Sequence, residues 1–179
     1  MKTYIALLRG INVSGHKKIK MADLRTMLEE LDFKKVETYI QSGNIVFGSS
    51  EKFLHVLEQM IQKEILKTFD FDVPVLVRTY DELKSIFEKN PFTDQVDIEK
   101  KQVYFAILKE TPAPDLMAAF KKEKFDHEEF LATGNCIYLN CLKGAAEAKL
   151  SNNLIERKLK VSATTRNYRT MLKLLEMAG

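Results

Sequence analysis

Residues Tyr4 to Arg9, with the sequence Tyr-Ile-Ala-Leu-Leu-Arg, return in similar form as Tyr-Phe-Ala-Ile-Leu-Lys at Tyr104 to Lys109. Each position is identical or chemically similar in the two stretches. Both are short apolar runs of the kind that form buried strands. A match at so long an interval indicates duplicated domains, because solenoid repeats recur every ~20 to 50 residues. We therefore expect two related halves that each open on a buried strand.

Two further matches follow in the same order along the chain. Tyr39 to Phe47 resembles Phe130 to Tyr138 around a shared Ser/Thr-Gly-Asn core. A weaker match aligns Val73 to Thr79 with Leu159 to Thr165. The conserved order of the three matches strengthens the case for duplication.

The spacing of the matches locates an insertion in the first copy. Tyr4 and Tyr104 are 100 residues apart, whereas Gly43 and its match Gly134 are 91 apart, so the first copy has nine more residues between its first two strands. Gly10 to Lys18 account for them. Because loops carry function on a shared scaffold, this insertion is the place to look for a ligand. Ordinary drift of a surface loop is the alternative.

Hydrophobic periodicity predicts the elements of each half. Apolar residues three and four apart mark one helix at Leu24 to Leu31 and another at Leu54 to Ile65. The sequence Thr79-Tyr80-Asp81-Glu82 is a capping box, which predicts a third helix ending near Asn90. The expected strands of the first half span 36–41, 44–47 and 73–78. In the second half we expect strands at 103–108, 128–133, 136–140 and 159–163, helices at 114–122 and 145–158, and a last helix capped by Thr165.

The predicted order in each half is β-α-β-β-α-β with a trailing helix, as in ferredoxin-like folds. The expected fold class is therefore α+β, an internal duplication of two ferredoxin-like halves at residues 1–92 and 93–179. Antiparallel sheets commonly leave one face in water. Residues 4–8 are apolar on both faces, however. We expect the other half or the trailing helix to cover the second face.

Composition indicates a folded protein of the cytoplasm. Hydrophobic residues make up 45% and charged residues 30% of the chain. No apolar run approaches the ~20 residues of a membrane span, so no membrane association is expected. The start, Met1-Lys2-Thr3, leads directly into a strand and has no signal segment.

No metal, cofactor or catalytic group is assigned from the sequence. Cys136 and Cys141 lack the Cys-x-x-Cys spacing of a redox or metal site, and Cys136 is expected to be a small core residue. The histidines are far apart, and no Ser-His-Asp or Cys-His order has a recognisable context. Binding and enzymatic turnover both remain open.

The basic loop from Arg9 to Lys18 is the candidate ligand site. Gly10 and Gly15 have the spacing of P-loop glycines, but His16 and Lys17 follow where that motif needs Lys and then Ser or Thr. Triphosphatase chemistry is therefore disfavoured. Glycines and positive charge before a helix still suit a small phosphate- or carboxylate-bearing ligand. A solvated basic loop is the alternative.

Two other segments are candidates to complete this site. Ser42-Gly43-Asn44 is typical of a tight turn, and Gln41 and Ser42 are candidates to hydrogen-bond a ligand beside the loop. Arg166 is expected in the first turn of the last helix, where the dipole opposes a cation by ~0.3 to 1 kcal/mol unless an anion binds. The alternative is that an exposed arginine is simply tolerated at this position, because the penalty is small. We predict one anion-binding cleft lined by Arg9, Asn12, His16, Lys17, Ser42 and Arg166.

Three blocks of sequence resemble a known family. They are Tyr4 to Gly15, Gln41 to Asn44 and Thr164 to Thr170. Together they are similar to a bacterial family catalogued as domain of unknown function 1697, over essentially the whole chain. The resemblance implies a duplicated α+β fold. It implies no activity, so function is argued from the site.

A nucleic-acid-binding or protein-interaction module that uses the sheet surface or the last helix is the alternative function. Paired ferredoxin-like halves resemble tandem RNA-recognition domains, and the formal charge is +3. The third strand of each half lacks the stacking pattern of such domains, however. A charge of +3 with 25 acidic residues is also weak. Nucleic acid is therefore disfavoured as a partner.

Overall fold

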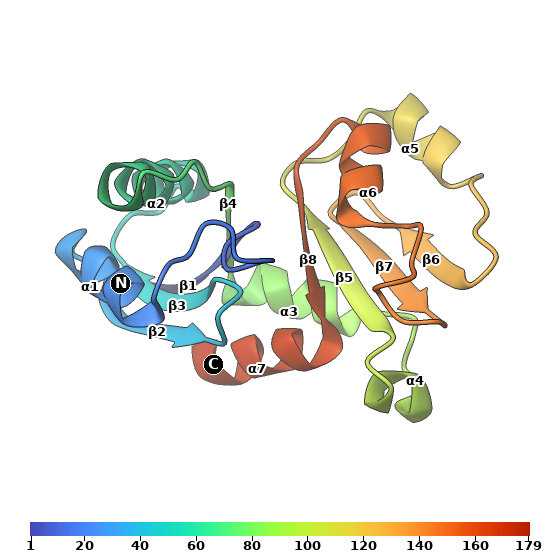
Figure 1. The fold of residues 1–179 in the computed structure, drawn as a ribbon, viewed down its shortest axis with the longest axis horizontal. Coiled ribbons are helices and arrows are strands. Elements are labelled where there is room, and N and C mark those ends of the chain that lie inside the picture. The colour runs from blue at the N-terminus through green and yellow to red at the C-terminus, as the bar shows by residue number, and fades with distance from the viewer. The chain divides into compact units, whose positions relative to one another are not determined.

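The computed structural model describes all 179 residues and contains eight strands and seven helices (Figure 1). The first half comprises β1 (Lys2–Leu8), α1 (Met21–Glu30), β2 (Lys34–Tyr39), β3 (Asn44–Ser49), α2 (Leu54–Phe69), β4 (Val75–Thr79) and α3 (Tyr80–Glu88). A short helix that the sequence did not predict, α4 (Gln95–Glu99), follows. The second half comprises β5 (Val103–Leu108), α5 (Pro114–Phe120), β6 (Glu128–Ala132), β7 (Cys136–Cys141), α6 (Asn152–Leu159), β8 (Ala163–Asn167) and α7 (Tyr168–Ala178).

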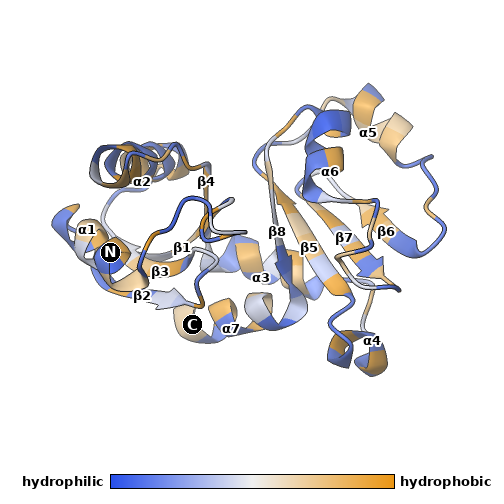
Figure 2. Cartoon of the chain, in the orientation of Figure 1, coloured by the Kyte–Doolittle hydropathy of each residue, from blue (hydrophilic) through white to orange (hydrophobic).

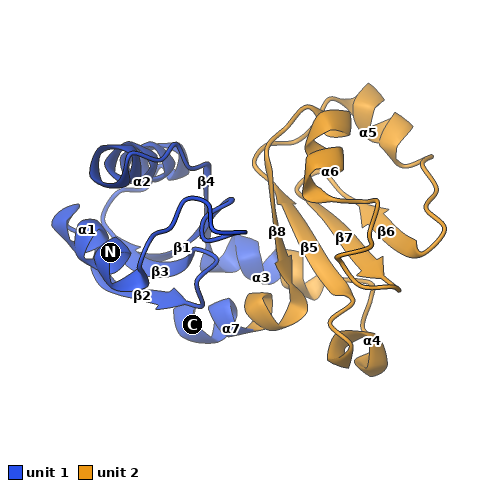
Figure 3. Ribbon diagram, in the orientation of Figure 1, with its two compact units in different colours: residues 1–85, 173–179 blue, residues 86–172 orange.

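The strands form two four-stranded antiparallel sheets of matching order, β2-β3-β1-β4 and β6-β7-β5-β8. The chain is thus α+β with two similar halves. It divides into two compact units (Figure 3). Unit 1 contains residues 1–85 together with 173–179, and unit 2 contains residues 86–172.

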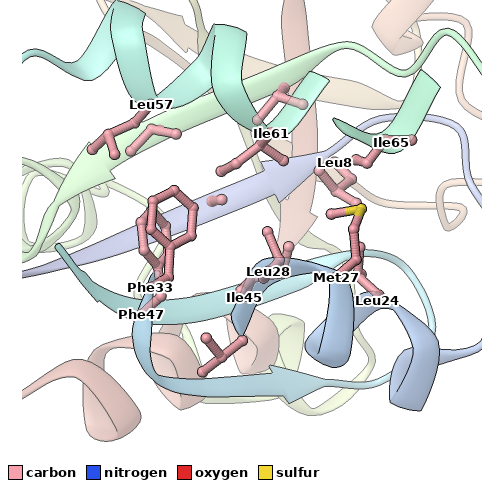
Figure 4. Packing of buried hydrophobic residues seen from close by; sticks show 14 of the residues in the cluster. Leu8, Leu24, Met27, Leu28, Phe33, Ile45, Phe47, Leu57, Ile61 and Ile65 are labelled. Carbon is pink, nitrogen blue, oxygen red and sulfur yellow. The ribbon is translucent and has the colours of Figure 1, made fainter. Parts of the chain in front are cut away.

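The core of unit 1 lies between one face of its sheet and the helices α1 and α2 (Figure 4). Phe33 stacks on Phe47 with ring centroids 4.5 Å apart. Each fully buried side chain of this size stabilises the fold by ~1.5 to 3 kcal/mol. The helices contribute Leu24, Met27 and Leu28 from α1 and Leu57, Ile61 and Ile65 from α2.

Both faces of the central strands of each sheet are buried, as the apolar first strand predicted. In unit 1, Ile5 and Leu7 are fully buried on the face away from α1 and α2. In unit 2, Phe87 stacks on Phe105 of the corresponding face with centroids 5.7 Å apart. The Tyr138 hydroxyl on that face donates to the Ile86 carbonyl at 2.9 Å. The end of α3 therefore covers the second sheet.

Both cysteines are buried in unit 2. Burial raises the pKa of the Cys136 thiol well above its usual range and that of Cys141 to about 11. Cys136 is thus the small core residue that the sequence predicted.

The backbone corrects the second repeat match by one residue. Leu8 N donates to Gly43 O at 2.8 Å, and Leu108 N donates to Asn135 O at 2.9 Å. Gly43 therefore corresponds to Asn135 and not to Gly134. The shared Gly-Asn letters misled the alignment because the second hairpin turn is shorter, 133–135 against 40–43. A slip of one residue exchanges the two faces of a strand.

The capping box at the start of α3 is confirmed. Thr79 Oγ1 accepts from Glu82 N at 3.2 Å, while Glu82 Oε2 accepts from Thr79 N at 2.8 Å. Each side chain thus satisfies a backbone donor of the other residue.

The start of the last helix differs from the prediction. Asn167 caps α7, because its Oδ1 accepts from Thr170 N at 2.9 Å, whereas Thr165 lies inside strand β8. The expected strand at 159–163 was placed too early. Helix α6 continues to Leu159 and ends at the left-handed Lys160, so the chain becomes extended only afterwards.

Candidate ligand-binding cavity

The first half does have the longer connection, but residues 9–33 between β1 and β2 exceed residues 109–127 between β5 and β6 by six residues and not by nine. Residues 9–20 join β1 to α1 in unit 1, whereas residues 109–113 suffice between β5 and α5 in unit 2 (Figure 1). The longer connection also enters the core, because Ile11 and Ile19 are only 1% and 3% exposed. A loop that supplies two core residues is more than a surface insertion.

Residues 12–17 of this connection form a small hairpin. Asn12 N donates to Lys17 O at 3.2 Å, and His16 N donates to Val13 O at 2.9 Å. Ser14 and Gly15 between them have φ values of 48° and 79°. Successive positive φ angles are typical of a type I′ turn. The turn therefore explains Gly15 without a ligand.

The side chain of Asn12 fastens the base of the hairpin. Its Nδ2 donates to Ile19 O at 2.9 Å and to Gln41 O at 2.8 Å. Its Oδ1 accepts from Ile19 N at 2.9 Å. These bonds join the hairpin to the turn between β2 and β3, so Asn12 serves to position the loop.

The other residues predicted for the site in unit 1 lie in or beside the loop, and each forms a hydrogen bond within the chain. Arg9 is half-buried, and its backbone N–H donates to the carbonyl of Pro74 at 3.0 Å. Lys17 Nζ donates to the carbonyl of Asp72. Ser42 Oγ accepts from Asn44 Nδ2 at 2.9 Å. His16 is exposed at the hairpin turn.

Arg166 lies in unit 2, on strand β8, opposite Phe105. It does not lie in the first turn of a helix, so the helix dipole gives no reason to expect an anion beside it. Its Nη1 donates to Thr165 O at 2.9 Å, and burial lowers the pKa of the guanidinium to about 10. In Figure 2, which is coloured by hydropathy, β8 changes from near-white to the blue of hydrophilic residues toward its end.

Unit 1 has a matching arginine. Arg78 lies opposite Ile5 on β4, and its Nη1 donates to Val77 O at 2.8 Å. Burial lowers the pKa of Arg78 as well. The same arginine in both sheets indicates a role in the shared fold, and a part for Arg166 in an anion site stays a prediction.

A cavity of about 590 Å³ opens beside the hairpin in unit 1. Cavities that bind small molecules span ~300 to 1,000 Å³. Of the six predicted residues only Asn12 lines it. Its apolar wall comprises Ile19, Met21 and Phe69, and its polar wall comprises Lys18, Lys20, Asp23 and Gln41.

The polar wall carries unused hydrogen-bonding groups. Lys18 and Lys20 are exposed, and their ammonium groups form no ion pair or hydrogen bond within the chain. Lys20 is also the N-cap residue of α1, and its side chain does not cap the helix. The first backbone N–H groups of α1 thus lack a side-chain acceptor, and they add partial positive charge beside the lysines.

Sequence reasoning missed part of this lining. Lys18 contributes to the basic charge of the predicted loop and Gln41 adjoins Ser42, but the predicted cleft included neither residue. Lys20 gave a usable signal because it lies four residues before the start of the helix predicted at Leu24 to Leu31. Phe69 continues the stripe of Leu57, Ile61 and Ile65 by one more interval of four residues, and so could have been placed beside the core.

These features define an α+β protein with two similar units, one of which holds a cavity of ligand size. The chain belongs to the family described as "Protein of unknown function (DUF1697)", which matches residues 1–138. The family resemblance noted in the sequence is thereby confirmed.

Among solved structures, the conserved bacterial protein SP0830 from Streptococcus pneumoniae is similar, with a TM-score of 0.73 and 23% identity. The similarity covers 99% of this chain and 98% of that chain, and at this identity it shows the fold alone. No curated protein matches the chain. None of the helices has the length and apolar character required to span a membrane.

Proposed function

We propose that the cavity in unit 1 binds a small molecule that carries a phosphate or carboxylate group. The main support is that Lys18 and Lys20 border a cavity of about 590 Å³ and that neither ammonium group has a partner inside the chain. A hydrogen bond to a charged group contributes ~1.5 to 3 kcal/mol. Exposure to solvent places each lysine at or below the lower end of that range.

The predicted loop residues take supporting parts in this proposal. Asn12 holds the hairpin in place, and Lys17 fastens it to the Asp72 carbonyl. Arg9, His16 and Ser42 surround the same loop and remain candidates for ligand contact. Arg166 remains a separate candidate, to be tested by its own substitution.

Titration calorimetry with phosphorylated and carboxylated metabolites tests the proposal. We expect a Lys18→Ala/Lys20→Ala double variant to bind about tenfold more weakly, since each ~1.4 kcal/mol changes affinity tenfold. Lys63→Ala, an exposed lysine of α2 away from the cavity, is the matched control. Equal affinity of the double variant and the control would contradict the proposal.

Use of the sheet surface or the last helix as a docking module has less support. The side chains on both faces of the central strands are buried. The apolar residues Met171, Leu174 and Leu175 of α7 are buried as well. The exposed apolar side chains on these surfaces include Leu131 of β6 and Leu172 of α7, and scattered residues of this kind do not form a docking patch.

We also propose that the halves at residues 1–92 and 93–179 are ferredoxin-like duplicates in a cytoplasmic protein. The matching strand orders and the equivalent backbone bonds around β1 and β5 support the duplication. An experimental structure with Tyr4 and Tyr104 at different topological positions would contradict it. Fractionation of cells that produce the protein tests the location.

A further inference from the structure

We propose that the ligand of the unit 1 cavity is a nucleoside monophosphate, bound through its phosphate on the lysine side and through its base on Phe69. This inference rests on the anion-binding function proposed above and assigns the chemical class of the ligand. Size, wall chemistry and local charge support it independently.

The cavity is too large for a bare anion. One water molecule occupies ~30 Å³ of liquid, so about 590 Å³ is the space of roughly twenty waters. A phosphate or carboxylate group alone would leave most of this space to solvent. A nucleoside monophosphate has a number of non-hydrogen atoms close to this number of waters. The ligand therefore has a body in addition to its charge.

The wall chemistry indicates a flat, partly apolar body. Phe69 ends α2, is half-buried against the core of unit 1, and turns its remaining surface to the cavity together with Ile19 and Met21. Aromatic side chains of this kind stack on nucleobases, whatever the base. An aliphatic acid would bury apolar surface against the ring but could not stack on it.

The remaining polar groups match the edges of a nucleoside. The Gln41 side-chain amide makes no hydrogen bond within the chain, and it offers both donors and an acceptor. The Asp23 carboxylate is likewise unpaired, and carboxylates in nucleotide sites accept from ribose hydroxyls. Both groups are therefore placed to bind a base edge or a sugar.

Local charge limits the number of phosphates. Lys18 and Lys20 contribute two positive charges to the cavity wall, and Asp23 contributes one negative charge. A net charge near +1 suits one phosphate, whereas a triphosphate would bring excess negative charge beside Asp23. The loop also lacks the hydroxyl that a P-loop uses to hold Mg²⁺ with a triphosphate.

A ligand series on the unaltered protein tests the inference by calorimetry. We expect AMP, GMP, CMP and UMP to bind with similar affinity, because stacking tolerates every base. Ribose 5-phosphate, which lacks the base, and adenosine, which lacks the phosphate, should each bind about tenfold more weakly than AMP. ATP should bind more weakly than AMP.

A variant separates the role of the ring from that of the charge. Phe69→Leu should weaken AMP binding about fivefold or more and leave ribose 5-phosphate unchanged, because only AMP stacks. Phe53→Leu, at an exposed phenylalanine of the same unit, is the matched control. Should Phe69→Leu unfold, Gln41→Ala and the ligand series still decide the question.

The outcomes distinguish the two proposals. Equal binding of ribose 5-phosphate and AMP, or AMP binding that ignores Phe69→Leu in the folded variant, would overturn the nucleotide assignment and leave anion binding intact. Binding of carboxylated metabolites in place of all nucleotides would do the same. Absence of binding by every phosphate and carboxylate would overturn both.

Discussion

The two halves are anchored alike at the end of the first strand and differ immediately after it. Arg9 N donates to Pro74 O at 3.0 Å, and its counterpart Lys109 N donates to Ser162 O at 2.8 Å. Beyond these anchors, one half builds a hairpin beside a cavity and the other passes directly to its helix. The two halves therefore share the arrangement of their strands and differ in this loop. Loops are where function on a shared scaffold usually lies.

The hairpin itself argues against neutral drift. A drifting insertion is expected to lie on the surface, because loops there accept added residues at small cost. Ile11 and Ile19 are buried instead, and Asn12 ties the segment to the β2–β3 turn. The difference between the two halves can therefore be tested by asking whether contacts of this kind stabilise unit 1 but not unit 2.

Gly43→Ala should cause the largest loss of stability, because the new methyl carbon would lie 2.5 Å from Leu8 Cβ. Its φ of 76° adds strain for any residue with a side chain. Overpacking and a positive φ together cost ~2 to 4 kcal/mol. Chemical denaturation measures the free energy of unfolding.

Gly134→Ala is the matched control in the second half. The added carbon would come no closer than 3.5 Å to Thr111 Cγ2, so the change should be within ~0.5 kcal/mol, as for ordinary surface substitutions. Equal losses at Gly43 and Gly134 would restore the alignment of these glycines and contradict the corrected register.

Asn12→Ala should destabilise the protein by ~1 to 3 kcal/mol, since it removes three hydrogen bonds, two of them to the part-buried backbone groups of Ile19. Hydrogen exchange should show faster opening of the Ile19 amide. Thr111→Ala, in the short connection of unit 2, is the control and should leave stability unchanged. A hairpin that stays protected in Asn12→Ala would show that the side chain does not hold it.

The helix caps of the two halves provide a smaller test. Thr79→Ala and Asn167→Ala should each cost ~1 kcal/mol, the usual value for losing an N-cap. Thr165→Ala should not remove a cap, because Thr165 lies within β8. Thermal unfolding of the three variants measures the difference. A loss of the α7 cap on changing Thr165, with Asn167→Ala neutral, would contradict the observed helix start.

Sequence predicted the parts of the fold that depend on local signals. The capping box at Thr79 needs only residues three apart, and the apolar period of α2 is set within the helix itself. The predicted start of β8 was wrong because residues 159–163 alternate in hydrophobicity as a strand does, whereas Leu159 is the last residue of α6. The hairpin register failed because similar letters outweighed a turn of different length.

Sequence directed attention to the loop of unit 1, but it did not predict most of the residues that line the cavity beside that loop. The insertion identified the loop, since duplication makes an extra segment visible. The direction of each side chain depends on partners far along the chain, as for Lys17 with the carbonyl of Asp72. Phe69 joins the cavity from the far end of another helix, and only folding brings it beside Lys18 and Lys20.

The smallest expected effect is on nucleic acid, for which we predict no specific RNA or DNA binding. Single-stranded RNA is recognised by exposed aromatic rings on a sheet, whereas Tyr4, Phe105 and Tyr138 are at most 1% exposed. A formal charge of +3 attracts phosphates only weakly. Fluorescence anisotropy with labelled RNA at two salt concentrations should show dissociation constants no tighter than the non-specific range of ~10⁻⁴ to 10⁻⁶ M. Submicromolar affinity at physiological salt, lost in Arg9→Ala or Lys17→Ala, would instead make the loop of unit 1 a nucleic-acid site, and the difference between the two halves would then concern a macromolecule.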